Sequence, residues 1–193
     1  MGPLAEKIIE SYTYADYLTW DDTERWELID GVPYNMSPAP SRRHQQISGE
    51  LLRQFANFLK GKPCQVYAAP FDVRLPEADE NVSDISTVVQ PDIAVICDAD
   101  KLDDAGCSGA PDLIVEITSP STSRKDHKEK FFRYERAGVR EYWLVEPDAN
   151  TVTVFTLGID TRYGRPDVYS DDETISVGVL PELVIDLALA FRK

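Results

Sequence analysis

The chain has 193 residues, of which 42% are hydrophobic and 28% are charged, and its formal net charge is −14. This length predicts a single domain over residues 1–193, with a core from about residue 12 to 187, and the composition is that of a globular protein. No apolar run approaches the roughly 20 residues of a membrane helix, and no signal-peptide core is recognisable, so we expect a cytoplasmic protein with no membrane partner. The acidity argues against a generic basic nucleic-acid binder.

The first part of the chain predicts two helices separated by a hairpin. Thr13 is expected to cap a short helix over residues 14–20. An Asp-Gly dipeptide in the middle of residues 26–36 favours the type I′ turn of a β-hairpin. Apolar residues recur at helical spacing over residues 41–60, and Gly61 is expected to end this helix.

The remainder predicts strands around one further helix. Strands are indicated by alternation or by continuous apolar runs at residues 71–75, 88–96, 112–118, 141–146, 151–155, 168–169 and 183–185. A helix is expected over residues 124–137, ended by Gly138, and two acidic segments, 77–84 and 98–104, are interpreted as solvated loops. This order predicts an α/β fold with a mixed β-sheet flanked by helices.

Cysteines and histidines are too few to suggest a soft-metal site. Cys64, Cys97 and Cys107 are odd in number and show no CxxC spacing, so we expect reduced, buried thiols without a disulfide framework. His44 and His127 are the only histidines, which excludes an HExxH motif. Chemistry must therefore come from carboxylates, lysines or backbone groups.

Two acids lie inside the most apolar predicted strands. Glu116 interrupts the run 113–117, and Asp92 follows Pro91 inside the run 88–96. An ionised carboxylate in a dry core is costly unless it is paired, protonated or bound to a metal. A solvated cleft or an arginine partner would explain one such acid, whereas two in neighbouring strands favour a shared cation. Pro91 cannot donate to a ladder and predicts a disrupted sheet just before Asp92.

A third acid, Glu27, lies in the hairpin, where a surface position is the simpler interpretation. Three carboxylates without His or Cys ligands favour Mg²⁺ or Mn²⁺ over zinc or copper.

A basic stretch follows Glu116. Residues 124–140 contain seven basic and three acidic residues, a local charge of +4. Asp126, Lys130 and Tyr134 are spaced to share one helical stripe. A solvated helix face explains such a pattern equally well, and the preceding hydroxyl-rich loop is expected either to cap the helix or to contact phosphate.

These motifs occur in an order that resembles the Uma-type putative restriction endonucleases of the PD-(D/E)XK nuclease superfamily. The resemblance runs from about Tyr12 to Leu187. It rests on WELIDG at 26–31, QPD at 90–92, VEITSPST at 115–122, DHKEKFFRY at 126–134 and GVREYWLV at 138–145.

The resemblance implies a restriction-endonuclease-like α/β fold and metal-dependent hydrolysis of phosphodiesters in DNA. Asp92 and Glu116 would then hold Mg²⁺, with Mn²⁺ as a substitute, helped by the carbonyl group of Ile117, and Glu27 would be an additional acid.

The lysine position departs from the superfamily pattern. That lysine normally lies two residues after the glutamate, where this chain has Thr118, and the Uma-type pattern places it at Lys130 instead. For His44, a surface or capping role is the simpler interpretation. Candidates for substrate contact are His44, Ser119, Lys128 and Tyr134.

The leading hypothesis is thus a Mg²⁺-dependent endonuclease acting on DNA. The alternative is a catalytically inactive nuclease fold that binds nucleic acid or a regulatory partner, which the net charge of −14 and the displaced lysine motivate. A glycosidase-like carboxylate pair is a third hypothesis, although it leaves the basic helix without a purpose. Cutting two strands with one site per chain makes a homodimer the expected assembly.

Overall fold

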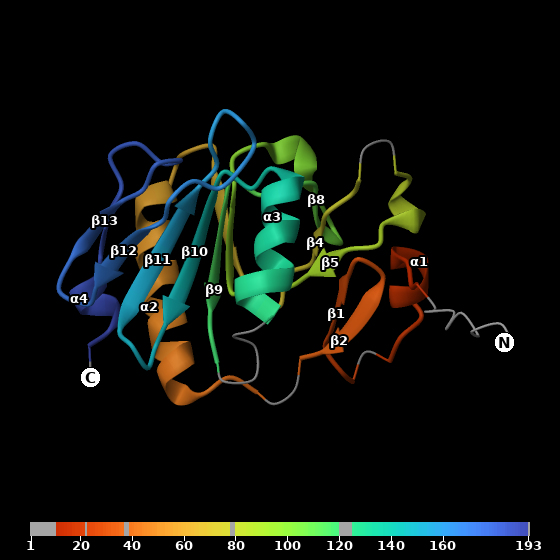
Figure 1. Ribbon diagram of the computed structural model, residues 1–193, viewed down its shortest axis with the longest axis horizontal. Coiled ribbons are helices and arrows are strands. Elements are labelled where there is room, and N and C mark those ends of the chain that lie inside the picture. The colour runs from red at the N-terminus through yellow and green to blue at the C-terminus, as the bar shows by residue number, and fades with distance from the viewer. Residues whose placement is uncertain (1–10, 22, 37–38, 78–79, 120–124, 193) are drawn as a thin grey trace, which may run out of the picture.

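The centre of the molecule is a mixed six-stranded sheet (Figure 1). The computed structural model describes residues 11–21, 23–36, 39–77, 80–119 and 125–192. The strand order is β12-β11-β10-β9-β6-β3, in which β9 and β10 are parallel and all other neighbours are antiparallel. The strands are β3 (Gln65–Ala68), β6 (Ile93–Ile96), β9 (Leu113–Ile117), β10 (Glu141–Glu146), β11 (Thr151–Thr156) and β12 (Asp167–Ser170).

Shorter strands form two further sheets. One is six-stranded, with the order β2-β1-β5-β4-β8-β7, and the other pairs β13 with β14. Their strands are β1 (Trp26–Ile29), β2 (Val32–Asn35), β4 (Val73–Arg74), β5 (Val88–Val89), β7 (Leu102–Asp103), β8 (Gly106–Ser108), β13 (Thr174–Ser176) and β14 (Val184–Asp186).

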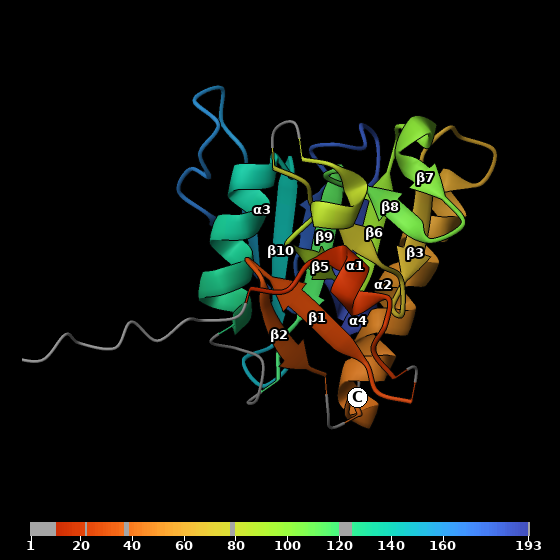
Figure 2. The ribbon, with the colours of Figure 1, turned by 90° about the vertical axis from the view of Figure 1, so that its right-hand side faces the viewer.

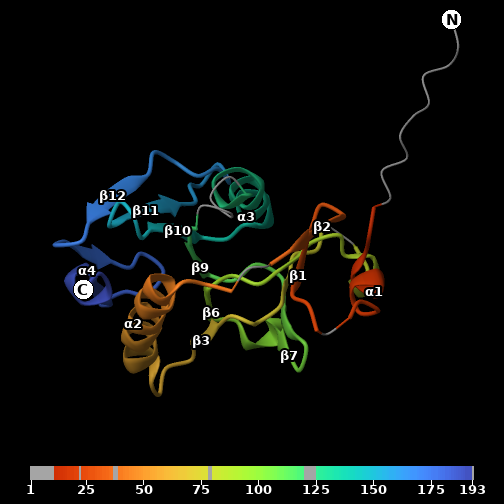
Figure 3. The same cartoon turned by 90° about the horizontal axis from the view of Figure 1, so that it is seen from below.

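Helices cover both faces of the central sheet, with α2 and α4 on one face and α3 on the other (Figures 2 and 3). The helices are α1 (Tyr14–Tyr17), α2 (Arg42–Leu59), α3 (Phe131–Ala137) and α4 (Leu187–Ala190), with 3₁₀ turns at Val82–Asp84 and Ala99–Lys101 and a π-helix at Lys125–Lys130. The expected mixed sheet flanked by helices is confirmed. No helix in the described part of the chain is long and apolar enough to cross a membrane.

The apolar strands are buried on both faces, as their continuous apolar runs predict. In β9, Leu113, Val115 and Ile117 enter the core beside α2. Ile114 instead enters the core that contains Tyr134 of α3. Because side chains alternate along a strand, Glu116 shares the face of Ile114 and points toward α3.

The chain changes sheet where Pro91 predicts a disruption. Residues 88–96 do not form one strand, because β5 belongs to the second sheet and β6 to the central sheet. The interruption covers residues 90–92 and releases Asp92 from the ladder just before β6 begins. The strand expected at 71–75 is likewise reduced to β4.

The helix and turn expectations hold at most boundaries. Thr13 forms a capping box with α1, which ends earlier than expected, and Ser41 caps α2. Asp30 and Gly31 both have positive φ angles, 48° and 77°, as a type I′ hairpin turn requires. The helix expected over 124–137 is α-helical only in α3, because the preceding turn is a π-helix, and residue 124 lies outside the described residues.

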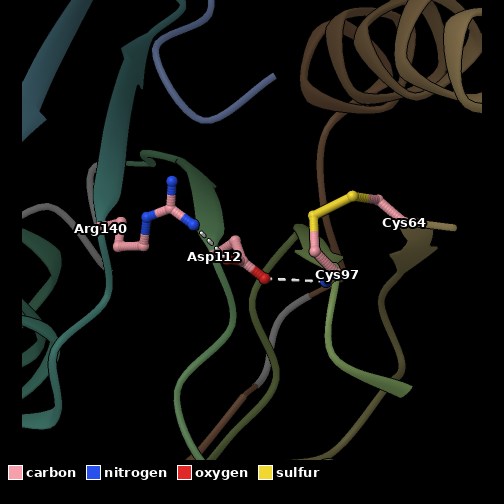
Figure 4. The surroundings of a disulfide bond; sticks show 4 residues. All are labelled: Cys64, Cys97, Asp112 and Arg140. Carbon is pink, nitrogen blue, oxygen red and sulfur yellow. Dashed lines mark hydrogen bonds and ion pairs between the residues drawn. A yellow bond between two sulfur atoms is a disulfide. The ribbon is translucent and has the colours of Figure 1, made fainter. Parts of the chain in front are cut away.

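The expectation of reduced cysteines is wrong for two of the three. Cys64 and Cys97 form a disulfide (Figure 4). Cys107 is a buried free thiol. The cause is register: Cys64 comes just before β3 and Cys97 just after β6, and the antiparallel pair Gln65↔Ile96 places the two cysteines opposite each other. Their separation of 33 residues hides this neighbourhood in the sequence. The disulfide removes one support for the predicted cytoplasmic location.

Candidate active site

Asp92 and Glu116 are brought together by strand register. β6 and β9 are antiparallel neighbours, and Ile93 pairs with Val115. The next positions along the two strands are Asp92 and Glu116, so these acids face each other at the end of the sheet. Both line a cleft of about 700 Å³ between the β1–β2 hairpin, the start of α2 and the π-helix.

Lys130 is the cation at the centre of this acidic cluster. Its Nζ lies 2.6 Å from Oε1 of Glu27, 2.8 Å from Oε1 of Glu116 and 3.8 Å from Oδ1 of Asp126. Lys130 is 2% exposed, so its charge is balanced by these carboxylates rather than by solvent. The predicted lysine position and two of the predicted acids thus converge on one point.

Glu27 is fully buried, contrary to the surface position that its place in the hairpin suggests. Its Oε1 also accepts a hydrogen bond of 3.0 Å from the backbone N–H of Gln90, and its Oε2 lies 2.5 Å from Nζ of Lys125. Burial alone would raise the pKa of Glu27, but the ammonium groups of Lys130 and Lys125 lower it below its ordinary value. Glu27 is therefore an ionised anchor for both lysines.

Glu116 has the opposite tendency. The pKa of Glu116 is raised to about 8, and burial is the main cause. The positive charge of Lys130 lowers this pKa. The negative charges of the neighbouring acids, Asp126, Glu27 and Asp92, raise it further. The hydroxyl group of Tyr134 donates to Oε1 of Glu116 at 2.6 Å. Burial is thus the main reason why the carboxyl group of Glu116 favours its protonated form.

Asp92 is held by a backbone amide and a histidine. The N–H of Ile117 donates to its Oδ2 at 2.7 Å, and Nε2 of His44 lies 3.2 Å from the same oxygen. His44 is only 8% exposed, which corrects the expectation of a surface histidine, although Ser41 does accept from its backbone N–H at the start of α2. Burial lowers the pKa of His44, but the Asp92 carboxylate raises it more, so the net shift is upward.

The other three residues predicted to contact substrate lie in different places. Ser119 lines the cleft. Tyr134 is buried beneath it and reaches Glu116. Lys128 is exposed and does not line the cleft, whereas its neighbour Lys125 does. The expected contact at Lys128 is therefore wrong, and Lys125 takes that place, because the π-helix at Lys125–Lys130 changes which side chains face the cleft.

Asp92, Glu116 and the carbonyl group of Ile117 are oxygen donors of the kind Mg²⁺ and Mn²⁺ prefer. Among the described residues, no three His, Cys, Asp or Glu side chains are grouped so as to enclose a metal ion. The predicted set has only two carboxylates, and the remaining positions would fall to the carbonyl, water or a phosphate oxygen. Four acids of the cleft and its floor, Glu27, Asp92, Glu116 and Asp126, lie with two lysines, Lys125 and Lys130, and this formal excess of acids suits a divalent cation.

Comparisons with known proteins agree with this architecture. A family model described as Uma2, putative restriction endonuclease, matches residues 14–190. An uncharacterized protein of Synechocystis sp. is 27% identical over 143 residues, which cover 72% of this chain and 71% of that protein. A crystal structure of a putative nuclease of the DUF820 group from Anabaena variabilis has a TM-score of 0.73 at 19% identity, covering 93% of this chain and 97% of that one.

Proposed function

Because the chain belongs to the Uma2 family of putative restriction endonucleases, we propose that it is a Mg²⁺-dependent endonuclease that hydrolyses phosphodiester bonds of DNA. The observation that carries the proposal is the meeting of Asp92, Glu116 and Lys130 at one cleft. Two carboxylates and an ammonium group are the residue types that metal-assisted phosphodiester hydrolysis needs.

Asp92, Glu116 and the Ile117 carbonyl would hold the metal, which when bound polarises a phosphoryl oxygen and activates water. The Ile117 N–H and His44 both contact Oδ2 of Asp92, and so they fix the direction of that carboxylate. Tyr134 and Lys130 both donate to Oε1 of Glu116 and so fix the direction of that carboxyl group. The chain thus orients its oxygen ligands before any substrate arrives.

Lys130 acts in this proposal as a positive charge rather than as a base. Burial lowers its pKa, but Glu116 and Glu27 raise it well above the ordinary lysine value, so the group remains an ammonium at neutral pH. An ammonium group held beside the cleft would offset negative charge that develops on the reacting phosphate. Glu27 and Lys125 keep it there.

Plasmid nicking tests the proposal. The wild-type chain is expected to nick DNA with Mg²⁺ and to lose the activity with EDTA. Asp92→Asn, which removes one ligand charge, should abolish nicking, whereas Asp148→Asn removes the same charge elsewhere in the cleft and should retain it. Equal nicking by wild type and Asp92→Asn would overturn the assignment.

A second candidate function is a nuclease fold that binds DNA without cutting it. The internal ion pairs of Lys130 with Glu27 and Glu116 favour it, because they satisfy both acids without a metal. Calorimetric titration separates the two functions: binding of Mg²⁺ or Mn²⁺ that Asp92→Asn abolishes supports the nuclease. No heat of binding up to millimolar metal supports the binding protein. A homodimer follows from the nuclease proposal if both strands of one site are cut, and sedimentation would detect it.

A further inference from the structure

Arg25 is a cation of the cleft that the ion-pair network leaves unused. It comes immediately before β1, is half-buried, and lines the cleft together with Asp92 and Glu116. In the described part of the chain, no carboxylate lies within ion-pair distance of its guanidinium group. The two lysines of the cleft differ, since both are paired with Glu27.

One edge of the Arg25 guanidinium is held by a single acceptor. Nε and Nη2 both donate to Oε1 of Gln90, at 2.9 and 2.7 Å. Gln90 is itself fixed, because its backbone N–H donates to Glu27 and its Nε2 donates to Oδ1 of Asp72 at 2.8 Å and to the hydroxyl group of Tyr17 at 3.3 Å. The guanidinium is thus positioned by Gln90, a residue fixed in a polar network and only two positions before Asp92 in the chain.

The opposite edge of the guanidinium, formed by Nη1 and the second N–H of Nη2, donates to none of the described residues. Such an edge matches two oxygens of a phosphate in a bidentate geometry. Arg43 also lines the cleft, but its Nη1 donates to the carbonyl group of Arg192 and its Nη2 to Oδ1 of Asn150. Arg43 is turned toward these acceptors, whereas Arg25 has a complete two-nitrogen edge that no described residue accepts from.

We propose that Arg25 binds a backbone phosphate of the nucleic acid in the cleft, beside the phosphate that Asp92 and Glu116 would address. Gln90 is the positioning residue that holds the guanidinium in place. This inference rests on the proposed function, since it assumes a nucleic-acid substrate. It explains how a chain with a net charge of −14 attracts a phosphate to an acidic site.

A purely structural role, in which Arg25 only ties the hairpin to Gln90, would leave DNA binding unchanged in a folded variant. The test therefore measures binding of a short labelled DNA duplex as a function of salt, with EDTA present so that no metal is needed. Loss of one phosphate contact lowers the slope of log K against log salt by about 0.9. Affinity at low salt should fall about tenfold, as for the loss of one charged hydrogen-bonded contact.

The variants are Arg25→Gln, Arg25→Lys and the control Arg165→Gln. Arg165 is exposed and does not line the cleft, so its variant has the same change in charge and should bind as wild type does. Arg25→Lys should keep the wild-type slope and lose affinity, because an ammonium cannot hold Gln90 and a phosphate together. Should Arg25→Gln fail to fold, Arg25→Lys carries the test.

The assignment of Arg25 is overturned if Arg25→Gln binds DNA with the wild-type slope and affinity; if only Arg25→Lys folds, the same result in that variant overturns it. It is also overturned if the wild-type chain binds no duplex at any salt concentration. If the wild type nicks plasmid with Mg²⁺ while Arg25→Gln binds normally, the assignment fails and the nuclease stands. If the slope depends on Arg25 while no nicking occurs with any metal, the nuclease fails and the assignment stands.

Discussion

Replacing Lys130 by methionine removes the cation that contacts Glu116 in the described part of the chain, while roughly preserving the volume of the side chain. Lys130 is 2% exposed and lies 2.8 Å from Glu116 and 2.6 Å from Glu27. Removing one partner of a buried ion pair typically costs about 3–5 kcal/mol. We expect about 3 kcal/mol, the low end, because Glu27 retains Lys125 and Glu116 can take up a proton.

The cost should depend on pH in a defined direction. The folded-state pKa of Glu116 is already raised, to about 8, above its ordinary value of 4.5, and without Lys130 it rises further. A carboxyl group with a raised folded-state pKa stabilises the fold fully below its unfolded pKa, and this contribution is lost as pH rises through the folded pKa. Lys130→Met should therefore be least destabilised near pH 5 and most destabilised near pH 9.

Urea denaturation of wild type and variant across this pH range measures the difference in the free energy of unfolding. Lys128→Met is the matched control, since Lys128 is exposed in the same helical turn and its loss should change stability by no more than about 0.5 kcal/mol. A Lys130→Met chain as stable as wild type at pH 9, or a cost that does not vary with pH, would refute the reasoning.

Three further predictions concern stability and reactivity. Tyr134→Phe removes the hydroxyl donor to Glu116 and should lower the free energy of unfolding by about 1 kcal/mol in thermal melts; an unchanged melting temperature contradicts the buried bond. Reduction of the Cys64–Cys97 disulfide, which closes a separation of 33 residues, should cost up to about 4 kcal/mol in urea titrations, and Cys97→Ser without reductant should match it. Burial raises the pKa of the Cys107 thiol to about 11, so alkylation at pH 8 should require unfolding, and rapid labelling of the native chain would contradict this.

The parts of the fold that follow local patterns were predictable from the sequence. Apolar spacing marks α2, the Asp-Gly turn marks the hairpin, and Pro91 marks the change of sheet. The parts that depend on register were not. The Cys64–Cys97 disulfide depends on the pairing of β3 with β6, and β3 itself has too short and mixed a pattern to be expected as a strand.

The candidate site shows the same division. Asp92 and Glu116 are conspicuous because each interrupts an apolar run, and the sequence alone marks them. Glu27 looks like a surface residue until the hairpin is packed against the rest of the chain, and the burial of His44 depends on where α2 starts relative to β6. Arg25 carries no local signal, because its position depends on Gln90, which lies 65 residues away in the chain.

A crystal structure determined with Mn²⁺ tests the central claim most directly, because anomalous scattering identifies the ion and its ligands. The account predicts an anomalous peak bound by carboxylate oxygens of Asp92 and Glu116 and by the carbonyl group of Ile117, at the roughly 2.0–2.2 Å usual for small divalent ions with oxygen ligands. The peak should vanish in Asp92→Asn. No peak at saturating Mn²⁺, or a peak that survives without the Asp92 carboxylate, would contradict the proposed metal site.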